Sequence, residues 1–344
     1  MSDKINLVGQ SLEQLKKLVN EWDFSSFRAK QLFNWLYNHK VRTVKQMNNL
    51  PNELQEKLQT EAKLRSMEII KEQTASDGTK KYLFSLADGV QVEAVYMPYQ
   101  DKRRSLCLST QAGCAMGCSF CATGLQGLER DLTAGEIIEQ LLLIEDKLKT
   151  EITNVVLMGM GEPLDNYQEV LKAIKLFNHF DGLNIGMRKI TLSTCGLVPQ
   201  IKKLAKENLQ LTLAISLHAV DDKLRSRLIP VNKRYPIQEL LSACRYYINQ
   251  TKRRVTFEYA LIAGVNDSVV EADKLAELLS GMLAHVNLIP INKVKTKDYN
   301  RSQRAQIDKF AARLDKNNIS TTIRVERGSD IDAACGQLKS RGED

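Results

Sequence analysis

Two kinds of hydrophobic pattern divide the chain near residue 100. Between residues 11 and 64, apolar side chains recur every three or four positions, as in Leu12, Leu15 and Leu18, which is the spacing of one helix face. Beyond residue 103, short apolar runs alternate with longer amphipathic stretches, which is the pattern of strands followed by helices. The chain is therefore predicted to contain a helical N-terminal module and a larger α/β region.

A β-hairpin is predicted between these two parts. Lys81–Ser85 and Val90–Met97 have strand-like patterns, and the Asp88-Gly89 dipeptide between them favours a tight turn. The predicted division is a helical accessory domain over residues 1–75, a hairpin extension over 76–100 and an α/β core over 101–344.

The core is predicted to consist of repeated strand–helix units. Regular βα alternation implies parallel strands with helices outside them. Six units fit a partial (β/α)6 barrel better than a complete barrel, and a doubly wound open sheet is the competing topology. In both arrangements, functional side chains gather at the C-terminal ends of the strands. The predicted strands are 105–109, 154–158, 189–194, 211–217, 255–261, 286–289 and 321–327, and the predicted helices are 134–147, 167–178, 199–205, 237–248, 271–279 and 303–314.

Composition narrows the class of protein. A hydrophobic fraction of 43% and a charged fraction of 26% are ordinary for a folded soluble protein. The longest apolar run, Leu141 to Ile144, is too short to cross a bilayer, and the N-terminus opens no apolar stretch. A cytoplasmic protein without a membrane partner is therefore expected. The net charge of +8 suits a polyanionic partner.

Three of the seven cysteines stand close together. Cys114, Cys118 and Cys121 have the spacing C-x-x-x-C-x-x-C after the first predicted strand, with Gly113 and Gly117 allowing a tight loop. Three thiolates can hold a four-iron cluster and leave one iron open to another ligand. A zinc site with a fourth ligand such as His218 is the alternative.

This loop resembles that of the radical S-adenosylmethionine superfamily. The resemblance implies a [4Fe-4S] cluster whose open iron binds S-adenosylmethionine and cleaves it to a 5′-deoxyadenosyl radical. Segments at later strand ends are predicted to bind the cofactor, with Glu162 accepting from its ammonium group. The predicted cofactor-binding residues are Gly161, Glu162, Ser193, Ser216, Leu217, His218 and Asn292.

The C-terminal segment makes the resemblance more specific. Asp330-Ile331-Asp332-Ala333-Ala334-Cys335-Gly336-Gln337-Leu338, taken with the cysteine loop, Met-Gly-Met-Gly-Glu-Pro and Ser-Leu-His, resembles the RlmN/Cfr family of RNA adenine methyltransferases over nearly the full chain.

The resemblance implies a mechanism with two further cysteines. Cys335 would accept a methyl group from one S-adenosylmethionine. A second S-adenosylmethionine would generate the radical that removes hydrogen from that methyl group, and the carbon would then add to the adenine. Cys107 would form a transient disulfide with Cys335 and free the base, and Glu93 matches a family position suggested as a proton acceptor.

The family also implies the substrate. The segments around 230–235 and 325–330 look more like the branch that methylates carbon 2 of an adenosine in 23S ribosomal RNA and also acts on transfer RNA. The alternative is the branch that methylates carbon 8 and confers antibiotic resistance. A reducing electron donor such as flavodoxin is implied, and a monomer is expected because no coiled-coil signal occurs.

Two other functions compete with RNA methylation. A non-catalytic iron–sulfur or zinc RNA-binding protein would need neither Cys107 nor Cys335. A radical enzyme acting on a small molecule would not need the basic N-terminal module. Basic residues proposed to contact RNA phosphates are Lys233, Arg234, Lys252, Arg253, Arg254, Lys293, Lys295 and Lys297.

Overall fold

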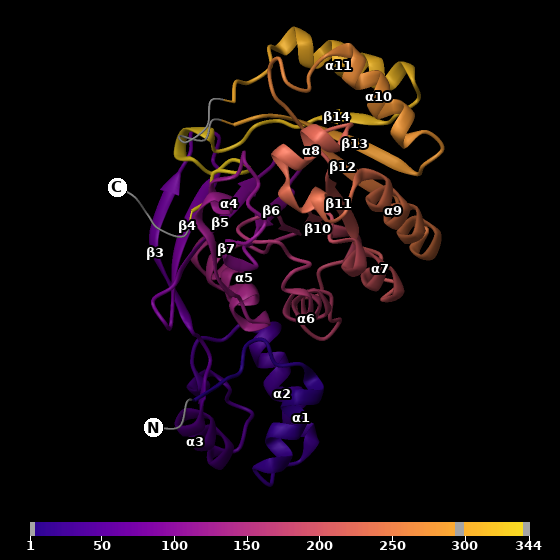
Figure 1. The fold of residues 1–344 in the computed structure, drawn as a ribbon. Helices are drawn as coiled ribbons and strands as arrows, with labels where there is room; N and C mark the ends of the chain where they lie inside the picture. Colours follow the sequence, from indigo (N-terminus) through magenta and orange to yellow (C-terminus); the bar gives the residue numbers. More distant parts are fainter. Residues whose placement is uncertain (1–3, 293–298, 340–344) are drawn as a thin grey trace.

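A ten-stranded sheet forms the centre of the molecule (Figure 1). The computed structural model describes residues 4–292 and 299–339, so Lys293, Lys295 and Lys297 lie outside the described residues. The strand order is β14-β13-β12-β11-β10-β9-β6-β5-β4-β3. Seven strands pair in parallel: β6 (Arg104–Cys107), β9 (Asn154–Leu157), β10 (Ile190–Thr194), β11 (Thr212–Ser216), β12 (Val255–Leu261), β13 (Ala284–Pro290) and β14 (Thr321–Ile323).

The order of the parallel strands decides between the two predicted topologies. From β6 to β14, each strand lies beside its predecessor in the parallel series, without the reversal that a doubly wound sheet requires. Because successive crossovers have the same hand, the helices fall on one face and the sheet curves into a partial barrel. The predicted (β/α)6 fold is confirmed. The helices are α5 (Ala134–Leu148), α6 (Tyr167–Phe177), α7 (Val198–Lys206), α9 (Ile237–Thr251), α10 (Val269–Leu279) and α11 (Arg304–Lys316), with a short α8 (Asp222–Leu228) before α9.

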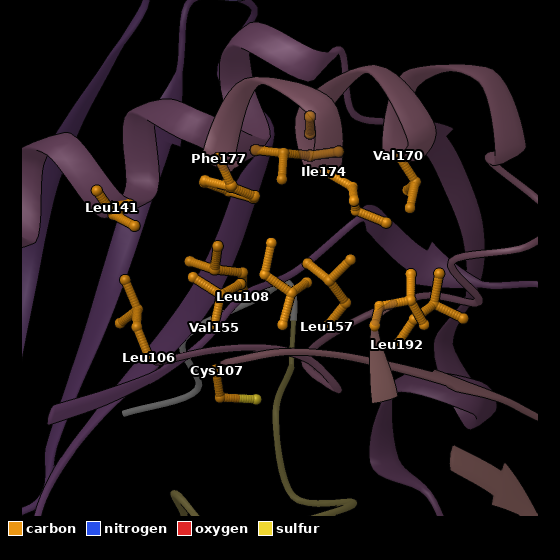
Figure 2. Close-up of a cluster of buried hydrophobic side chains, with 14 of the residues drawn as sticks. Leu106, Cys107, Leu108, Leu141, Val155, Leu157, Val170, Ile174, Phe177 and Leu192 are labelled. Carbon is orange, nitrogen blue, oxygen red and sulfur yellow. The ribbon is translucent and has the colours of Figure 1, made fainter. Parts of the chain in front are cut away.

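The hydrophobic core between strands and helices sets the direction of a key cysteine. Leu106 and Leu108 point from the β6 region toward the apolar side chains of α6, whereas Cys107 points to the other face of the sheet (Figure 2). Successive side chains of a strand alternate between faces. Cys107 is thereby directed toward the inside of the barrel and toward the C-terminal segment (Figure 2).

An antiparallel extension continues the sheet beyond β6. The predicted hairpin is present as β4 (Lys80–Leu86) and β5 (Gln91–Pro98), and β5 pairs with β6. A third strand, β3 (Met67–Thr74), pairs with β4 and was not predicted. This extension brings the hairpin within reach of the end of the chain.

The N-terminal module is helical, as predicted. Its helices are α1 (Leu12–Glu21), α2 (Ser26–Tyr37) and α3 (Asn52–Glu61), and a short parallel pair, β1 (Ile5–Asn6) with β2 (Ala62–Lys63), closes it. It packs against the start of α5, where a Cβ on Gly9 would lie 2.4 Å from the Gly135 nitrogen. In the described part of the chain, every helix is too short or too polar to span a lipid bilayer.

Candidate active site

The three clustered cysteines lie on a loop at the C-terminal end of the barrel strands. After Cys107 the chain forms a small hairpin of β7 (Gln111–Cys114) and β8 (Gly127–Asp131). The short helix α4 (Ala122–Gln126) begins directly after Cys121. The cysteine loop is therefore the connection within a hairpin, whereas the sequence predicted a loop directly after the first strand.

Gly113 makes this hairpin possible. Its φ is +76°, and a Cβ at this position would lie 1.9 Å from the Gly127 carbonyl oxygen. A side chain is excluded both by the backbone conformation and by the opposing strand. Gly117, with φ +63°, turns the chain between Cys114 and Cys118. Both predicted roles of glycine in the loop are borne out by this geometry.

The thiols of the loop face one cavity. Cys114, Cys118 and Cys121 line an opening of about 980 Å³ of unfilled space, here called the cysteine-loop cavity. Burial is the largest cause that raises the pKa of all three thiols, to about 12 for Cys114. Bound cationic iron would favour the thiolates that burial alone disfavours.

The donor set fits an iron–sulfur cluster better than a single metal ion. Among residues 4–292 and 299–339, no three His, Cys, Asp or Glu side chains converge as ligands of one ion would. In a four-iron cluster each thiolate binds a different iron, so three sulfurs spaced around one cavity suit it.

The ring of His218 is held in the tautomer that carries its proton on Nε2. Its Nδ1 accepts the Ala260 N–H at 2.9 Å, so the proton of the neutral ring is on Nε2. Burial lowers the pKa of His218 to about 3, and Arg225 acts in the same direction, which keeps the ring neutral. A protonated Nε2 cannot bind zinc, and this tautomer argues against the zinc alternative.

Six of the seven residues predicted to bind S-adenosylmethionine line the cysteine-loop cavity. Leu217 is the exception, because its side chain is fully buried in the core and its carbonyl accepts from Arg225 Nε. The six that share the cavity are Gly161, Glu162, Ser193, Ser216, His218 and Asn292.

Glu162 is fixed in the wall of this cavity. Its two carboxylate oxygens accept the N–H groups of Cys195, at 2.7 Å, and Leu164, at 3.0 Å. Burial raises the pKa of Glu162. The side chains of Thr194 and Cys195 also lie within hydrogen-bond reach of this carboxylate, and a bound ammonium group would replace one of them as donor. Cys195 is part of the same wall.

Asn292 offers an unsatisfied acceptor to a ligand. Its Nδ2 donates to the Cys335 carbonyl at 3.2 Å, whereas its Oδ1 is buried without a hydrogen-bond partner in the described part of the chain. A buried amide oxygen without a partner is costly, and a bound group that donates to it would remove that cost. The residues present therefore fit the predicted cofactor.

A second cavity joins the first at Cys335. This terminal cavity contains about 770 Å³ of unfilled space, and Cys107 and Cys335 both line it. Cys121, Asn292 and Cys335 line both cavities. Burial raises the pKa of Cys107 to about 12, and Cys335 nearby acts in the same direction. Both cysteines are free thiols. The structure thus brings together the two cysteines that the sequence assigned to one mechanism.

The terminal segment, residues 328–339, is anchored from two sides. On the cysteine loop, Ala122 N–H donates to the Gly336 carbonyl at 2.7 Å and Thr123 Oγ1 to the Leu338 carbonyl at 2.7 Å. On the hairpin, Glu93 accepts the Lys339 N–H at 2.9 Å and contacts Lys81 Nζ at 3.0 Å. Glu93 does not line either cavity. The role of Glu93 as proton acceptor remains a prediction. Its contacts show in addition that Glu93 tethers the terminal segment to the hairpin.

Sequence reasoning missed two arginines of the site. Arg324, just after β14, lines both cavities, and its pKa is raised chiefly by its proximity to Cys335. Arg225 is fully buried and donates to the carbonyls of Cys195, at 2.7 Å, and Ser216, at 3.0 Å. The last strand was predicted over 321–327, which placed Arg324 in its middle, whereas β14 ends at Ile323 and leaves Arg324 at the strand end.

Comparison with known proteins gives the family. Residues 108–276 match the Radical SAM superfamily, and residues 5–64 match the ribosomal RNA large subunit methyltransferase N-terminal domain. A crystal structure of a radical SAM methyltransferase from Sphaerobacter thermophilus superposes with a TM-score of 0.94 at 44% identity, covering 98% of this chain and 100% of that one.

Curated relatives are similar over the same length. A probable dual-specificity RNA methyltransferase RlmN from Clostridium novyi (strain NT) is 48% identical over 97% of both chains. A protein of the same name from Bacillus pumilus (strain SAFR-032) is 46% identical over 99% of this chain and 95% of its own. The chain belongs to the RlmN family of radical S-adenosylmethionine RNA methyltransferases.

Proposed function

We propose that this protein methylates carbon 2 of an adenine in 23S ribosomal RNA and in transfer RNA, using Cys335 as the methyl carrier. The observation that carries the proposal is the position of Cys335, which lines both the cysteine-loop cavity and the terminal cavity. A methyl carrier must reach the methyl donor on one side and the base on the other. The names of the curated relatives support an RNA substrate of two kinds.

The cysteine-loop cavity is the proposed cofactor site. Cys114, Cys118 and Cys121 would hold a [4Fe-4S] cluster, and Glu162 and Asn292 would accept hydrogen bonds from S-adenosylmethionine. When bound, the two groups supply a methyl group and a carbon radical that removes hydrogen. Arg225 keeps the ends of β10 and β11 in place beside them through its bonds to Cys195 and Ser216.

The terminal cavity is the proposed site of the target base. Its walls combine apolar side chains, such as Val95, Met97 and Ile289, with the guanidinium of Arg324. A cavity whose apolar walls alternate with polar and charged groups suits a planar heterocycle with ring-nitrogen acceptors. An adenine inside a duplex cannot reach such a cavity, so the substrate base must be unstacked from its neighbours.

The two thiols act in sequence in this proposal. Cys335 Sγ takes up the methyl group and loses its proton. The methyl carbon, after loss of one hydrogen atom, bonds to carbon 2 of the adenine. That ring carbon then gives up its own hydrogen as a proton, and the adduct gives up one electron, which replaces the electron supplied when the radical was formed. Cys107 Sγ, as the thiolate, then attacks Cys335 Sγ. The S–S bond forms, the bond from sulfur to the base-linked carbon breaks, and that carbon takes a proton. The disulfide is transient in a reducing compartment.

Glu93 is expected to act both as a tether and as a proton acceptor. Glu93→Gln keeps an oxygen for the Lys339 N–H but cannot take a proton, so methylation should fall by about 10²-fold while the terminal segment stays docked. Glu93→Ala removes both functions and should also make residues 328–339 sensitive to protease. The measurements are methylation rate and limited proteolysis of each variant. If Glu93→Gln methylates RNA at the parent's rate, Glu93 is not the proton acceptor and only its role as a tether remains.

The position of the product methyl group tests the proposed function. The reconstituted protein would be incubated with S-adenosylmethionine carrying a deuterated methyl group, a reductant, and transcripts of the peptidyl-transferase region of 23S ribosomal RNA or of transfer RNA. Digested nucleosides would be compared with standards by mass spectrometry. Labelled 2-methyladenosine from both RNAs is the expected product. Labelled 8-methyladenosine, or 5′-deoxyadenosine without modified RNA, would contradict the proposal.

A further inference from the structure

Two arginines stack on one tyrosine beside the terminal cavity. The guanidinium carbon of Arg103 lies 3.9 Å from the centre of the Tyr99 ring, and that of Arg327 lies 4.3 Å from the same centre. Two planar guanidinium groups cannot both fit so close to the centre on one face. They therefore lie on opposite faces, and the three side chains form a layered stack, here called the Arg–Tyr–Arg stack.

The stack lies at the open side of the cavity. Tyr99 and Arg327 line the terminal cavity, and so does Val325, whose side chain is 74% exposed to solvent. Arg103 is exposed in the turn between β5 and β6, where the Tyr99 N–H donates to the Arg103 carbonyl at 2.9 Å. Arg103 thus lies in the turn between β5 and β6, and Arg327 lies directly before the terminal segment.

The positive charge of the stack is only partly neutralised. Asp101 lies 3.9 Å from Arg103 Nε, and both side chains are about half exposed, so this ion pair contributes little. Arg327 Nη1 lies 3.7 Å from Asp77 Oδ2, and its Nε is buried without a hydrogen-bond partner in the described residues. Arg324 adds a third guanidinium inside the cavity.

Such a stack fits an anion better than a base. Both faces of the Tyr99 ring are already covered, so the ring cannot stack on a nucleobase. Each guanidinium keeps N–H donors at its edge, and its fork matches the oxygens of a phosphate. Cation–π contacts hold the two groups in place before the ligand arrives.

We infer that the Arg–Tyr–Arg stack binds the phosphodiester groups on either side of the target adenosine. This inference rests on the proposed function, because it assumes that the base enters the terminal cavity. Phosphate contacts at the cavity mouth fix the register of the nucleotide without reading the neighbouring bases. The same contacts serve ribosomal and transfer RNA, whose backbones are chemically identical. Lys252, Arg253 and Arg254, by contrast, precede β12 and lie at the opposite end of the barrel.

Salt-dependent RNA binding tests the inference. The full-length, cluster-loaded protein would be titrated with a labelled transcript of the peptidyl-transferase region, and fluorescence anisotropy would be recorded at several salt concentrations. Arg103→Gln and Arg327→Gln should each reduce the slope of log K against log salt by about 0.7–0.9, which corresponds to a loss of up to about eightfold in affinity at 0.1 M salt. Tyr99→Phe should bind as the parent does, and Tyr99→Leu should lose affinity.

Arg188→Gln is the matched control. Arg188 is exposed and precedes β10, at the end of the barrel away from the cavity, so its loss should leave the slope unchanged. Equal slopes for Arg103→Gln, Arg327→Gln and the control would overturn the inference, and so would a loss of affinity without a change of slope. Iron content and 5′-deoxyadenosine formation at the parent's level show that a variant is intact. A parent that binds RNA with the full slope but makes no methyladenosine would instead contradict the proposed function alone.

Discussion

Replacement of Cys335 by alanine should abolish methylated adenosine. The variant lacks the sulfur that carries the methyl group between the two cavities, and no other cysteine lines both cavities except Cys121, which is assigned to the cluster. The expected loss is at least about 10³-fold, since the residue takes part directly in bond formation. Nucleoside mass spectrometry after a long incubation with substrate RNA measures it.

Cys244→Ala is the control for this variant. Cys244 is fully buried in α9 and lines neither cavity, so its replacement removes a thiol of the same kind without touching the site. It should keep the iron content and most of the methylation rate. If Cys335→Ala methylates RNA as fast as Cys244→Ala does, the carrier role of Cys335 is wrong.

Replacement of Cys107 by alanine should trap RNA on the protein. In the proposed sequence, Cys107 breaks the link between Cys335 and the base, and it lines the same cavity as Cys335. Without it, the bond from Cys335 through the methylene carbon to adenine has no nearby thiol to cleave it. A covalent protein–RNA species should accumulate, close to one RNA per active protein, and should be visible on a denaturing gel.

The double variant Cys107→Ala/Cys335→Ala separates this adduct from nonspecific cross-linking. It should form none, because the attachment point is missing. A Cys107→Ala protein that turns over repeatedly and releases methylated RNA would show that another group resolves the intermediate. An adduct that persists in the double variant would show that the link does not run through Cys335.

The repeated βα pattern was sufficient to predict a parallel sheet with helices outside it. Parallel strands are buried on both faces, so their apolar runs stand out, and each is followed by an amphipathic helix. β3 was missed because it lies at the edge of the sheet and carries charged residues such as Lys71 and Glu72. α8 was missed because it is short and its sequence, Asp222–Leu228, is mostly polar. The choice between a partial barrel and an open sheet could not be made until the strand order was known.

Short motifs predicted most of the site, because strand ends converge wherever parallel strands align. The cysteine loop, Glu162, His218 and Asn292 share one cavity as expected. The roles of Arg324 and Arg225 could not be predicted, since they depend on which carbonyls and thiols the folded chain places around a guanidinium. The bond from Lys339 to Glu93 joins residues 246 positions apart and has no sequence signal.

The fate of a labelled methyl group tests the central claim most directly. The reconstituted protein would be exposed to S-adenosylmethionine labelled on its methyl group, digested, and its cysteine-containing peptides analysed by mass spectrometry, before and after a chase with reductant and substrate RNA. The account predicts label on the peptide containing Cys335, and its transfer to adenine during the chase. Label that reaches adenine while the Cys335 peptide is never labelled would contradict it.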